Sequence, residues 1–307
     1  MKKHIELFYK IKPIIPRRFQ IFLRRMVAFQ KLKANKEKWP INPKSARSPE
    51  GWKGWPDEKK FALILSHDVD TAKGYDKCTK LMDLEKKLGF RSSFNFVLED
   101  YRVSDTLRRN LSEAGFEVGV HGLKHDGKLF SSREIFEKRA PIINRYIKEW
   151  GAVGFRAPSM HHNLEWISEL NIEHDNSTFD TDPFEPQPDG IESIFPLWIM
   201  NKSKTHGYVE LPYTLPQDHC LFVILKQKDI SIWKDKLDWI VQNGGLALLN
   251  THPDYMNFNG TRISLEEYPI NHYKSFLEYV KTEYAGQYWH PLPKELARFW
   301  KSSVSNL

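Results

Sequence analysis

Four strand-like segments of this 307-residue chain are each followed by side chains that could bind a metal or transfer protons. These side chains are Asp68 and Asp70, His121 and His125, Arg156, and His252. Carboxylates and imidazoles are common ligands of zinc-like metals and common general acids and bases at neutral pH. Because the carboxyl ends of parallel strands meet at one edge of a sheet, we expect these residues to form a single site.

Asp68 and Asp70 come shortly after the apolar run from Phe61 to Leu65, which predicts a strand buried on both faces. In an extended chain, side chains two residues apart point the same way, so both carboxylates share one face. Two carboxylates this close repel each other unless a cation, a shared proton or a donor lies between them. A helix cap followed by a turn acid is the simpler interpretation of this stretch alone. For His67 we expect a packing or supporting role.

His121 and His125 are four residues apart, a spacing that on a helical turn would bring both imidazoles within reach of one metal. Gly122 occupies the place where a metalloprotease motif has its glutamate, which excludes that motif. A lone histidine pair at this spacing more often binds nothing. Its position directly after a strand, in a chain with an unexplained aspartate pair, favours metal binding.

The composition indicates a folded protein, because 40% hydrophobic and 13% aromatic residues are ample for a core. The two cysteines, Cys78 and Cys220, are too few for a disulfide framework. No run of about 18 apolar residues is present, so no transmembrane helix is predicted. The N-terminal segment also lacks the shape of a signal peptide. We therefore expect a cytoplasmic location.

The net charge of +7 comes from the N-terminal segment: residues 1–38 hold 12 Lys or Arg and two Glu, and the remaining residues carry a net charge of −3. The main body therefore gives no reason to expect nucleic-acid binding. Residues 17–33 predict a helix with apolar residues near one face, namely Phe19, Phe22, Leu23, Met26 and Phe29. This helix could make peripheral contact with an anionic membrane surface or bind an acidic polymer. The simpler interpretation is that its apolar face packs against the main domain.

Two parts are expected along the chain: residues 1–60 form a basic amphipathic arm with a Pro/Trp/Gly-rich connector, and residues 61–307 form a catalytic domain. In the second part, strand and helix patterns alternate, which implies a parallel sheet, closed or open. The predicted strands are 61–65, 92–97, 117–120, 154–156 and 246–250, and the predicted helices are 75–88, 105–114, 135–150, 233–242 and 265–284.

Five short blocks occur in a specific order between residues 61 and 256. They are Ser66-His67-Asp68-Val69-Asp70, Val120-His121-Gly122-Leu123-Lys124-His125, Gly154-Phe155-Arg156-Ala157-Pro158, Asp175-Asn176-Ser177 and Leu248-Leu249-Asn250-Thr251-His252-Pro253. In this order they resemble the polysaccharide deacetylase superfamily, carbohydrate esterase family 4, with its NodB-type homology domain. The resemblance implies an α/β fold, a distorted and incompletely closed (β/α)7 barrel.

The resemblance also implies roles for matching positions. Asp68 would be the catalytic base, Arg156 would hold it, and His252 would be the general acid, while Asp70, His121 and His125 would bind one divalent metal. This ligand set suits Zn²⁺ best and accepts Co²⁺, Ni²⁺ or Fe²⁺. The acid that orients His252 is Asp175 or Asp180. The fourth block does not distinguish them, because no Trp follows either acid.

Two further positions depart from the family pattern. Gly122 replaces the Ser or Thr of many members, so one loop-fixing hydrogen bond is missing, and Pro158 is followed by Ser159 rather than by an aromatic residue. Candidate substrate-binding residues are Pro158, Asp180, Glu210 and Tyr213.

The expected function is a metal-dependent hydrolase that removes an acyl group from a carbohydrate. The preferred acyl group is N-acetyl, and the carbohydrate is a glycan, or a lipid-linked or nucleotide-linked sugar. Hydrolysis of a non-peptide C–N bond in a small molecule, as in allantoinase-like relatives, is the nearer alternative. The second alternative is a glycan-binding relative that has no catalytic activity. Since no secretion signal is recognised, a sugar inside the cell, with the arm near the membrane, is the preferred substrate.

Overall fold

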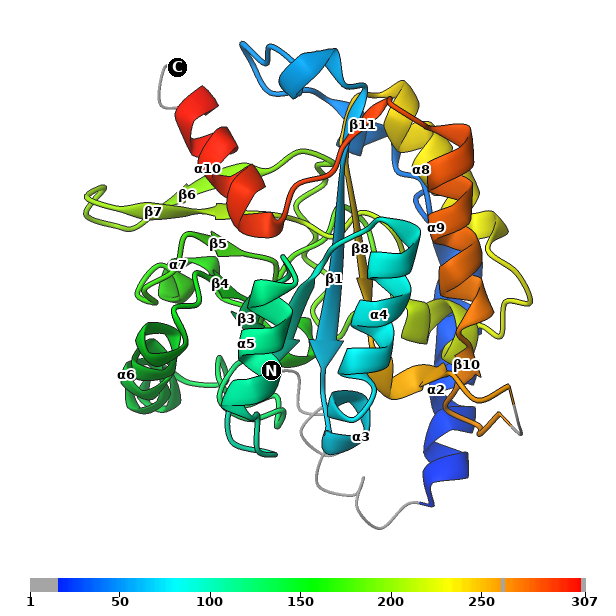
Figure 1. Cartoon of the computed structure of the whole chain (residues 1–307), viewed down its shortest axis with the longest axis horizontal. Coiled ribbons are helices and arrows are strands. Elements are labelled where there is room, and N and C mark those ends of the chain that lie inside the picture. The colour runs from blue at the N-terminus through cyan, green and yellow to red at the C-terminus, as the bar shows by residue number, and fades with distance from the viewer. Residues whose placement is uncertain (1–15, 261–262, 305–307) are drawn as a thin grey trace.

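A curled, mostly parallel sheet forms the centre of the computed structural model (Figure 1), which describes residues 16–260 and 263–304. Within these residues the strand order is β11-β1-β2-β3-β4-β5-β7-β6, with β8 also paired to β1, and only β6 and β7 pair antiparallel. The strands are β1 (Phe61–Val69), β2 (Ser93–Phe96), β3 (Glu117–Val120), β4 (Gly154–Phe155), β5 (His174–Asp175), β6 (Leu197–Met200), β7 (Gly207–Glu210), β8 (Leu246–Thr251) and β11 (Tyr288–Trp289). A separate pair consists of β9 (Met256–Asn257) and β10 (Tyr268–Pro269).

β1 is the central strand, and all nine of its residues are buried. It pairs with β8 from Ala62 to His67, with β11 at its first two residues and with β2 at its last four. A strand with no face toward water needs an apolar sequence on both sides, which the run from Phe61 to Leu65 supplies. The strand predicted from that run is therefore confirmed.

Among the described residues, single bridges between the chain after β7 and its neighbours close the barrel. Phe179 bridges Tyr213, and Leu215 bridges Leu249 of β8. Thr214 strengthens the second contact by donating its backbone N–H to the carbonyl of Leu248 at 3.1 Å. A distorted, incompletely closed (β/α) barrel is therefore the observed fold, as the sequence predicted.

Helices cover the outside of the sheet. They are α2 (Arg17–Ala34), α3 (Ala72–Tyr75), α4 (Cys78–Leu88), α5 (Asp105–Glu113), α6 (Arg133–Trp150), α7 (Leu164–Ile167), α8 (Ser231–Gln242), α9 (Asn271–Glu283) and α10 (Pro293–Val304). Short helical turns are η2 (Pro43–Ala46), η3 (Pro56–Glu58), η4 (Pro158–Met160), the π-helical η5 (His219–Ile224) and η6 (Pro253–Tyr255). Gly89 and Gly151 end α4 and α6 in the left-handed conformation, which explains why glycine marked these ends correctly.

The last predicted helix needs a correction at its start. It was expected from Leu265, but α9 begins at Asn271, and the preceding Tyr268 and Pro269 form β10. A residue before proline is disfavoured in the helical conformation, and here Tyr268 is extended. Ile270 then donates its N–H to the carbonyl of Asn257 instead of continuing a helix backward.

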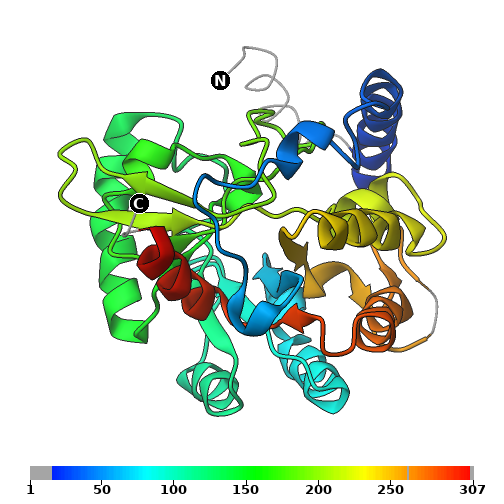
Figure 2. The same cartoon turned by 90° about the horizontal axis from the view of Figure 1, so that it is seen from above.

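α2 forms where it was predicted but packs with the unexpected face. The residues that it buries are Gln20, Ile21 and Ala28. Phe22 and Phe29, from the predicted apolar face, are 53% and 52% exposed, so the expectation that this face packs against the main domain is wrong. Figure 2 shows α2 at the periphery of the molecule, next to η5. Within the described ranges, none of the helices has the length and apolar character needed to cross a membrane.

His67 points away from Asp68, into a closed network of hydrogen bonds between β1 and its covering helices. Its Nδ1 lies 2.7 Å from Thr251 Oγ1, and its Nε2 lies 2.9 Å from Glu85 Oε1. Glu85 also accepts hydrogen bonds from the hydroxyls of Ser92 and Tyr273. His67 is therefore part of the packing between sheet and helices.

Candidate functional site

The six residues predicted from the strand ends lie together at the carboxyl edge of the sheet, on or just after β1, β3, β4 and β8. The Asp68 carboxylate lies 3.3 Å from Arg156 Nε, 3.9 Å from His121 Nδ1 and 4.0 Å from His252 Nε2. Asp70 lies 3.4 Å from His121 and equally far from His125. The fold therefore assembles all six into one cluster.

Asp70, His121 and His125 form a group that could hold a metal ion, with one ligand atom from each within 4.8 Å of the others. Asp70 Oδ1 faces the Nε2 atoms of both histidines at 3.4 Å, yet it is buried and has no hydrogen-bond partner. A buried carboxylate oxygen without a partner is costly, and a cation between the three groups would remove that cost. The donor set therefore fits a divalent metal, and an Asp-His-His set suits zinc.

The orientation of His121 also fits metal binding. Its Nδ1 lies 3.1 Å from the backbone carbonyl oxygen of Arg156, so that nitrogen carries the proton and donates it. The Nε2 lone pair is then directed toward Asp70, as in histidines whose second nitrogen is fixed by a carbonyl. The neighbouring His125 and His121 outweigh the effect of burial and hold the pKa of Asp70 well below its usual range.

The segment that carries the two histidines is a loop, which corrects the expectation of a helical turn. Gly122 has a φ of +66°, and a Cβ there would lie 2.6 Å from Pro158 Cγ. A Ser or Thr at this position would therefore clash, which explains the departure from the family pattern. The loop is instead fixed by Asp100, whose carboxylate accepts the backbone N–H of His125 at 2.7 Å.

Asp254 supports Asp70 from the segment after β8. Its Oδ2 accepts the backbone N–H of Asp70 at 3.0 Å, and its Oδ1 accepts the hydroxyl of Thr71. Gly74 makes this approach possible, because a Cβ there would lie 2.1 Å from Asp254 Oδ2. Burial and the nearby Asp70 raise the pKa of Asp254 to about 6.

Asp68 is held by two amides in addition to Arg156. Asn250 donates to Asp68 Oδ2 at 2.8 Å, and Asn95 donates to Oδ1 at 3.1 Å. Both donors come from strands that pair with β1. The carboxylate is thus fixed in place by groups that favour its ionised form.

The charges around Asp68 decide its protonation state. Burial raises the pKa of its carboxyl, but the nearby positive charge, to which Arg156 contributes most, outweighs burial and lowers the pKa below its ordinary value. Asp68 is therefore ionised at neutral pH and able to accept a proton.

In contrast to Asp68, His252 is surrounded by groups that favour its protonated form. Its Nδ1 lies 2.7 Å from Asp218 Oδ1, and its backbone N–H donates to Asp218 Oδ2 at 2.9 Å. Tyr268 fixes the same Asp218 oxygen with its hydroxyl at 2.9 Å. Burial lowers the pKa of His252, but the charge and hydrogen bond of Asp218, together with the charges of Asp70 and Asp68, raise it to about 10. The imidazolium directs its Nε2 proton toward the Asp68 side of the site.

The contact with Asp218 corrects the expectation that Asp175 or Asp180 orients His252. Asp175 accepts hydrogen bonds from Ser177, through its backbone N–H at 3.2 Å and its hydroxyl at 2.7 Å. Asp180 forms a buried ion pair with Lys236. Both acids are committed to structural partners, so a carboxylate from the segment that closes the barrel takes the place next to His252.

Several residues of the site were not assigned by the sequence, among them Asn95, Asn250 and Asp218. A usable signal existed for the first two, because each is a polar side chain inside a buried strand and Asn250 lies two residues before His252. For Asp218 no local signal distinguishes it from other loop acids.

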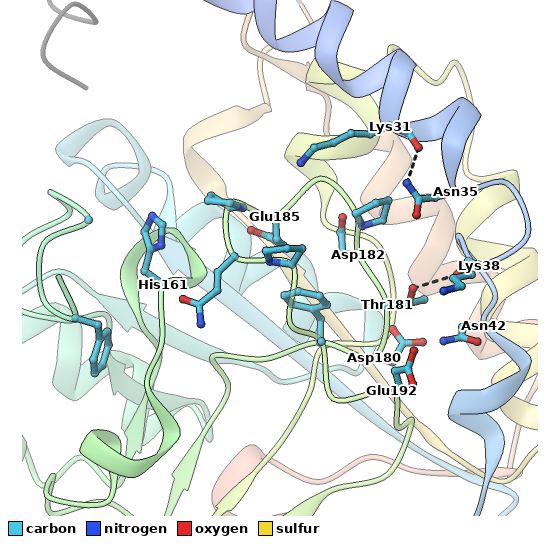
Figure 3. Close-up of a pocket in the computed structure, with 18 of the residues that line it drawn as sticks. Lys31, Asn35, Lys38, Asn42, His161, Asp180, Thr181, Asp182, Glu185 and Glu192 are labelled. Atoms are coloured by element: carbon cyan, nitrogen blue, oxygen red, sulfur yellow. Dashed lines mark hydrogen bonds between the residues drawn. The ribbon is translucent and has the colours of Figure 1, made fainter. Parts of the chain in front are cut away.

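A pocket of about 780 Å³ lies between α2 and the loop from Phe179 to Glu192 (Figure 3). Lys31 faces it from α2 and Asn35 from just beyond that helix, Asp182 and Glu185 face them from the loop, and His161 lies farther along. Of the four predicted substrate-binding residues, only Asp180 is part of this lining.

The other three candidates have structural contacts. Tyr213 is buried, and its hydroxyl lies 2.9 Å from Asp182 Oδ2 and 2.8 Å from Glu185 Oε1. Pro158 is buried against Gly122, and Glu210 is fully buried, where it accepts hydrogen bonds from Thr178.

The pocket connects to Asp68 through hydrogen bonds. Gln217 donates to Glu185 Oε1 at 2.7 Å and accepts from Asn250 at 3.4 Å, and Asn250 donates to Asp68. Burial and the charge of Asp182 raise the pKa of Glu185 to about 8. The pocket lining includes none of the six cluster residues, but a chain of hydrogen bonds through Gln217 and Asn250 links Glu185 of the pocket wall to Asp68.

The fold and the site together place this protein in the class of structures with the polysaccharide deacetylase fold. A structure from Mycobacterium smegmatis assigned as a polysaccharide deacetylase superposes with a TM-score of 0.63 and 16% identity, covering 84% of this chain and 96% of that one. One from Pseudomonas aeruginosa PAO1 has a TM-score of 0.62 and 14% identity over 81% and 93%. The structure of Puue allantoinase has a TM-score of 0.62 and 15% identity over 81% and 92%.

These likenesses confirm, at the level of the fold, the resemblance to the polysaccharide deacetylase superfamily that the sequence blocks predicted. No protein-family profile matches the chain, and its sequence matches no curated protein.

Proposed function

We propose that this protein is a metal-dependent hydrolase that removes an acyl group from a carbohydrate, with N-acetyl as the preferred acyl group. One observation carries the proposal: the ionised Asp68 lies between the metal-binding group and the protonated His252, 3.9 Å from His121 and 4.0 Å from His252. A base and an acid on neighbouring positions beside a metal site are the groups that amide hydrolysis requires.

When bound by Asp70, His121 and His125, a divalent metal would supply Lewis acidity, which lowers the pKa of water toward about 7 and polarises an acyl carbonyl. Asp68 would accept the proton of the attacking water, because its carboxylate is ionised and faces the metal-binding group. Arg156 holds this carboxylate in position during the transfer.

His252 would donate a proton to the leaving nitrogen, since an amine departs readily only in its protonated form. The imidazole is suited to this step because its raised pKa keeps it protonated at neutral pH. Asp218 fixes the ring through Nδ1 and leaves Nε2 as the donor. We therefore assign Asp218 the role of positioning residue for His252.

The pocket that is linked to the cluster through Gln217 and Asn250 supports a polar substrate. Its volume of about 780 Å³ lies in the usual range for ligand pockets. Charged and amide side chains line it, including Lys31, Asn35, Asp182 and Gln187, which suits the many hydroxyls of a sugar.

The direct test is acetate release from a panel of N-acetylated mono- and oligosaccharides. We expect release by the metal-loaded protein, loss after dialysis against a chelator, and recovery when Zn²⁺, Co²⁺, Ni²⁺ or Fe²⁺ is added. His252→Ala should abolish release while the metal content stays unchanged. Release that survives complete metal removal, or that is unchanged in His252→Ala, would contradict the proposal.

A second candidate is hydrolysis of a non-peptide C–N bond in a small molecule. It is favoured by the similarity to Puue allantoinase, whose TM-score equals that of one of the two deacetylase structures. Assaying ammonia and ring opening on a panel of ureides alongside acetate separates the two. Tight sugar binding with release of neither product would instead indicate a binding protein without turnover.

A further inference from the structure

Seven of the eight large apolar side chains that are exposed among the described residues lie on α2 or on the loop beside it. These seven, which we call the α2 apolar face, are Phe19, Phe22, Met26, Val27, Phe29, Ile263 and Leu265, each 39% to 53% exposed. Arg17 ties the loop to the first turn of α2 through its ion pair with Glu266. Such a concentration of exposed apolar area marks an interaction surface.

α2 is oriented so that its apolar side faces outward. From Phe19 to Phe29 the large residues follow each other at intervals of three, four and three, which forms one stripe along the helix. The buried residues Gln20, Ile21 and Ala28 lie on the opposite side. Arg25 adds to that attachment by donating to the carbonyl of Val223 at 3.0 Å. The helix is therefore held by its other side, and the side chains of the stripe are exposed.

Basic residues accompany the stripe. Lys33 continues it one turn after Phe29, and Arg18 lies one turn before Phe22; both are exposed. Residues 1–38 hold 12 Lys or Arg and only two Glu. The acids on the neighbouring loop are neutralised, Glu266 by Arg17 and Glu267 by Lys73. The partner surface that complements this face is apolar and negatively charged.

The position of α2 relates it to the candidate site. In Figure 1 its first turns extend past the carboxyl end of β1, the edge at which the site lies. Its last turns contribute Lys31 to the pocket, followed by Asn35 just beyond the helix. A partner bound to the outer side of α2 would therefore lie close to the pocket.

We propose that the α2 apolar face inserts into the interface of an anionic lipid bilayer, with Arg18 and Lys33 contacting the phosphate groups of lipids. A convex helix with Phe and Met on one side and basic residues beside them is the pattern of interfacial membrane helices, whereas a protein partner usually meets a flatter or grooved surface. The orientation brings the pocket to sugars carried on lipids; only this extension rests on the proposed hydrolase function.

Flotation of the full chain with vesicles tests the proposal. We expect binding to vesicles of phosphatidylcholine with phosphatidylglycerol, weaker binding to phosphatidylcholine alone, and weakening by salt. Phe22→Asp and Met26→Asp should each reduce binding about tenfold or more. The reason is that each change replaces a large apolar side chain, which would move from water into the bilayer interface, with a charged one. Arg18→Glu with Lys33→Glu should reduce it by at least about 25-fold, since each basic residue near an anionic surface contributes about fivefold and the two glutamates add repulsion.

Met200→Asp is the matched control, because Met200 is also exposed, at 42%, but lies on β6. It should float like the unaltered protein, and all variants should keep the same melting temperature. Failure of the unaltered protein to float with anionic vesicles overturns the proposal. So does a dimer, measured by light scattering, that Phe22→Asp dissociates while no vesicle binding occurs, because the face would then bind a second copy. Acetate release is a separate measurement, so loss of activity and loss of membrane binding are distinguishable.

Discussion

Two buried polar clusters originate from adjacent residues of β1, and they differ in how completely their polar atoms are paired. Around His67, contacts of 2.7 and 2.9 Å join the imidazole to Thr251 and Glu85, and none of these three residues has a buried polar atom without a partner. Around Asp68 the ion-pair distances are 3.3 to 4.0 Å. Asp70 Oδ1 and Arg156 Nε in that second cluster have no hydrogen-bond partner.

The difference shows that a buried histidine and carboxylate do not by themselves identify a site. Both clusters contain them, and both lie on the same strand. The His67 cluster is closed by its own hydrogen bonds, which stabilise the fold. The Asp68 cluster keeps two buried polar atoms without a hydrogen-bond partner, which is costly unless a ligand completes it. We therefore expect substitutions in the two clusters to have opposite consequences for activity and stability.

The largest effect is expected for Asp68→Asn. Removal of the proton acceptor should lower kcat by about 10² to 10⁴-fold, the usual contribution of a general base. The metal content should stay the same, because Asp68 is outside the metal-binding group. The measurements are acetate release at saturating substrate and metal analysis of the purified variant. A kcat close to that of the unaltered protein would remove Asp68 from the role of base.

A second large effect is expected for His125→Ala. The histidine is partly exposed, so the fold should survive its truncation, but the metal-binding group loses one of three donors. Metal affinity should fall by more than the roughly 10 to 100-fold that loss of a supporting residue causes. Titration with a competing chelator measures this directly, and His67→Gln is the matched control that should leave the affinity unchanged. Equal affinities in His125→Ala and the unaltered protein would mean that the metal binds elsewhere.

Asp218→Asn should change the pH dependence of turnover. The charge of Asp218 raises the pKa of His252, so its removal lowers that pKa and the imidazolium loses its proton at lower pH. The alkaline limb of the kcat profile should move down by about 1 to 3 units, the usual effect of one opposite charge. The acid limb should not move. An unshifted alkaline limb would indicate that it reports a group other than His252.

The smallest effect is expected for Glu85→Gln, the same carboxylate-to-amide change made in the closed cluster. It weakens charge-assisted hydrogen bonds to His67, Ser92 and Tyr273 and should lower the free energy of unfolding by about 1.5 to 3 kcal/mol. The kcat per folded molecule should be unchanged, because Glu85 contacts His67 on the face of β1 opposite to Asp68. Urea denaturation and active-site-normalised turnover are the two measurements. A loss of kcat without a loss of stability would reverse the comparison between the clusters.

Much of the site could be predicted from sequence because its information is local. The buried run ending at Asp68 and Asp70 defines β1, and the alternation of side chains along a strand separates Asp68 from His67. The strand-end positions of His121, Arg156 and His252 then imply a shared edge. The glycines after α4 and α6 mark helix ends for the same local reason, since the left-handed conformation favours glycine.

Other features depend on contacts between distant segments. Asp218 is 34 residues from His252 in sequence, and only the way in which the chain after β7 closes the barrel makes it the partner instead of Asp175 or Asp180. Gly122 looks like a missing hydrogen bond in the sequence but is required by the close approach of Pro158.

The sequence by itself determined the central strand, the order of the motifs, the metal-ligand types and the amphipathic character of α2. Tertiary structure alone decided which carboxylate orients His252 and which side of α2 faces outward. The physical reason is that a helix with apolar residues on one side is equally consistent with packing inward and with binding a partner. The choice depends on the docking of Gln20, Ile21 and Ala28 against the body of the protein, which leaves Phe22 and Met26 exposed at 53% and 48%.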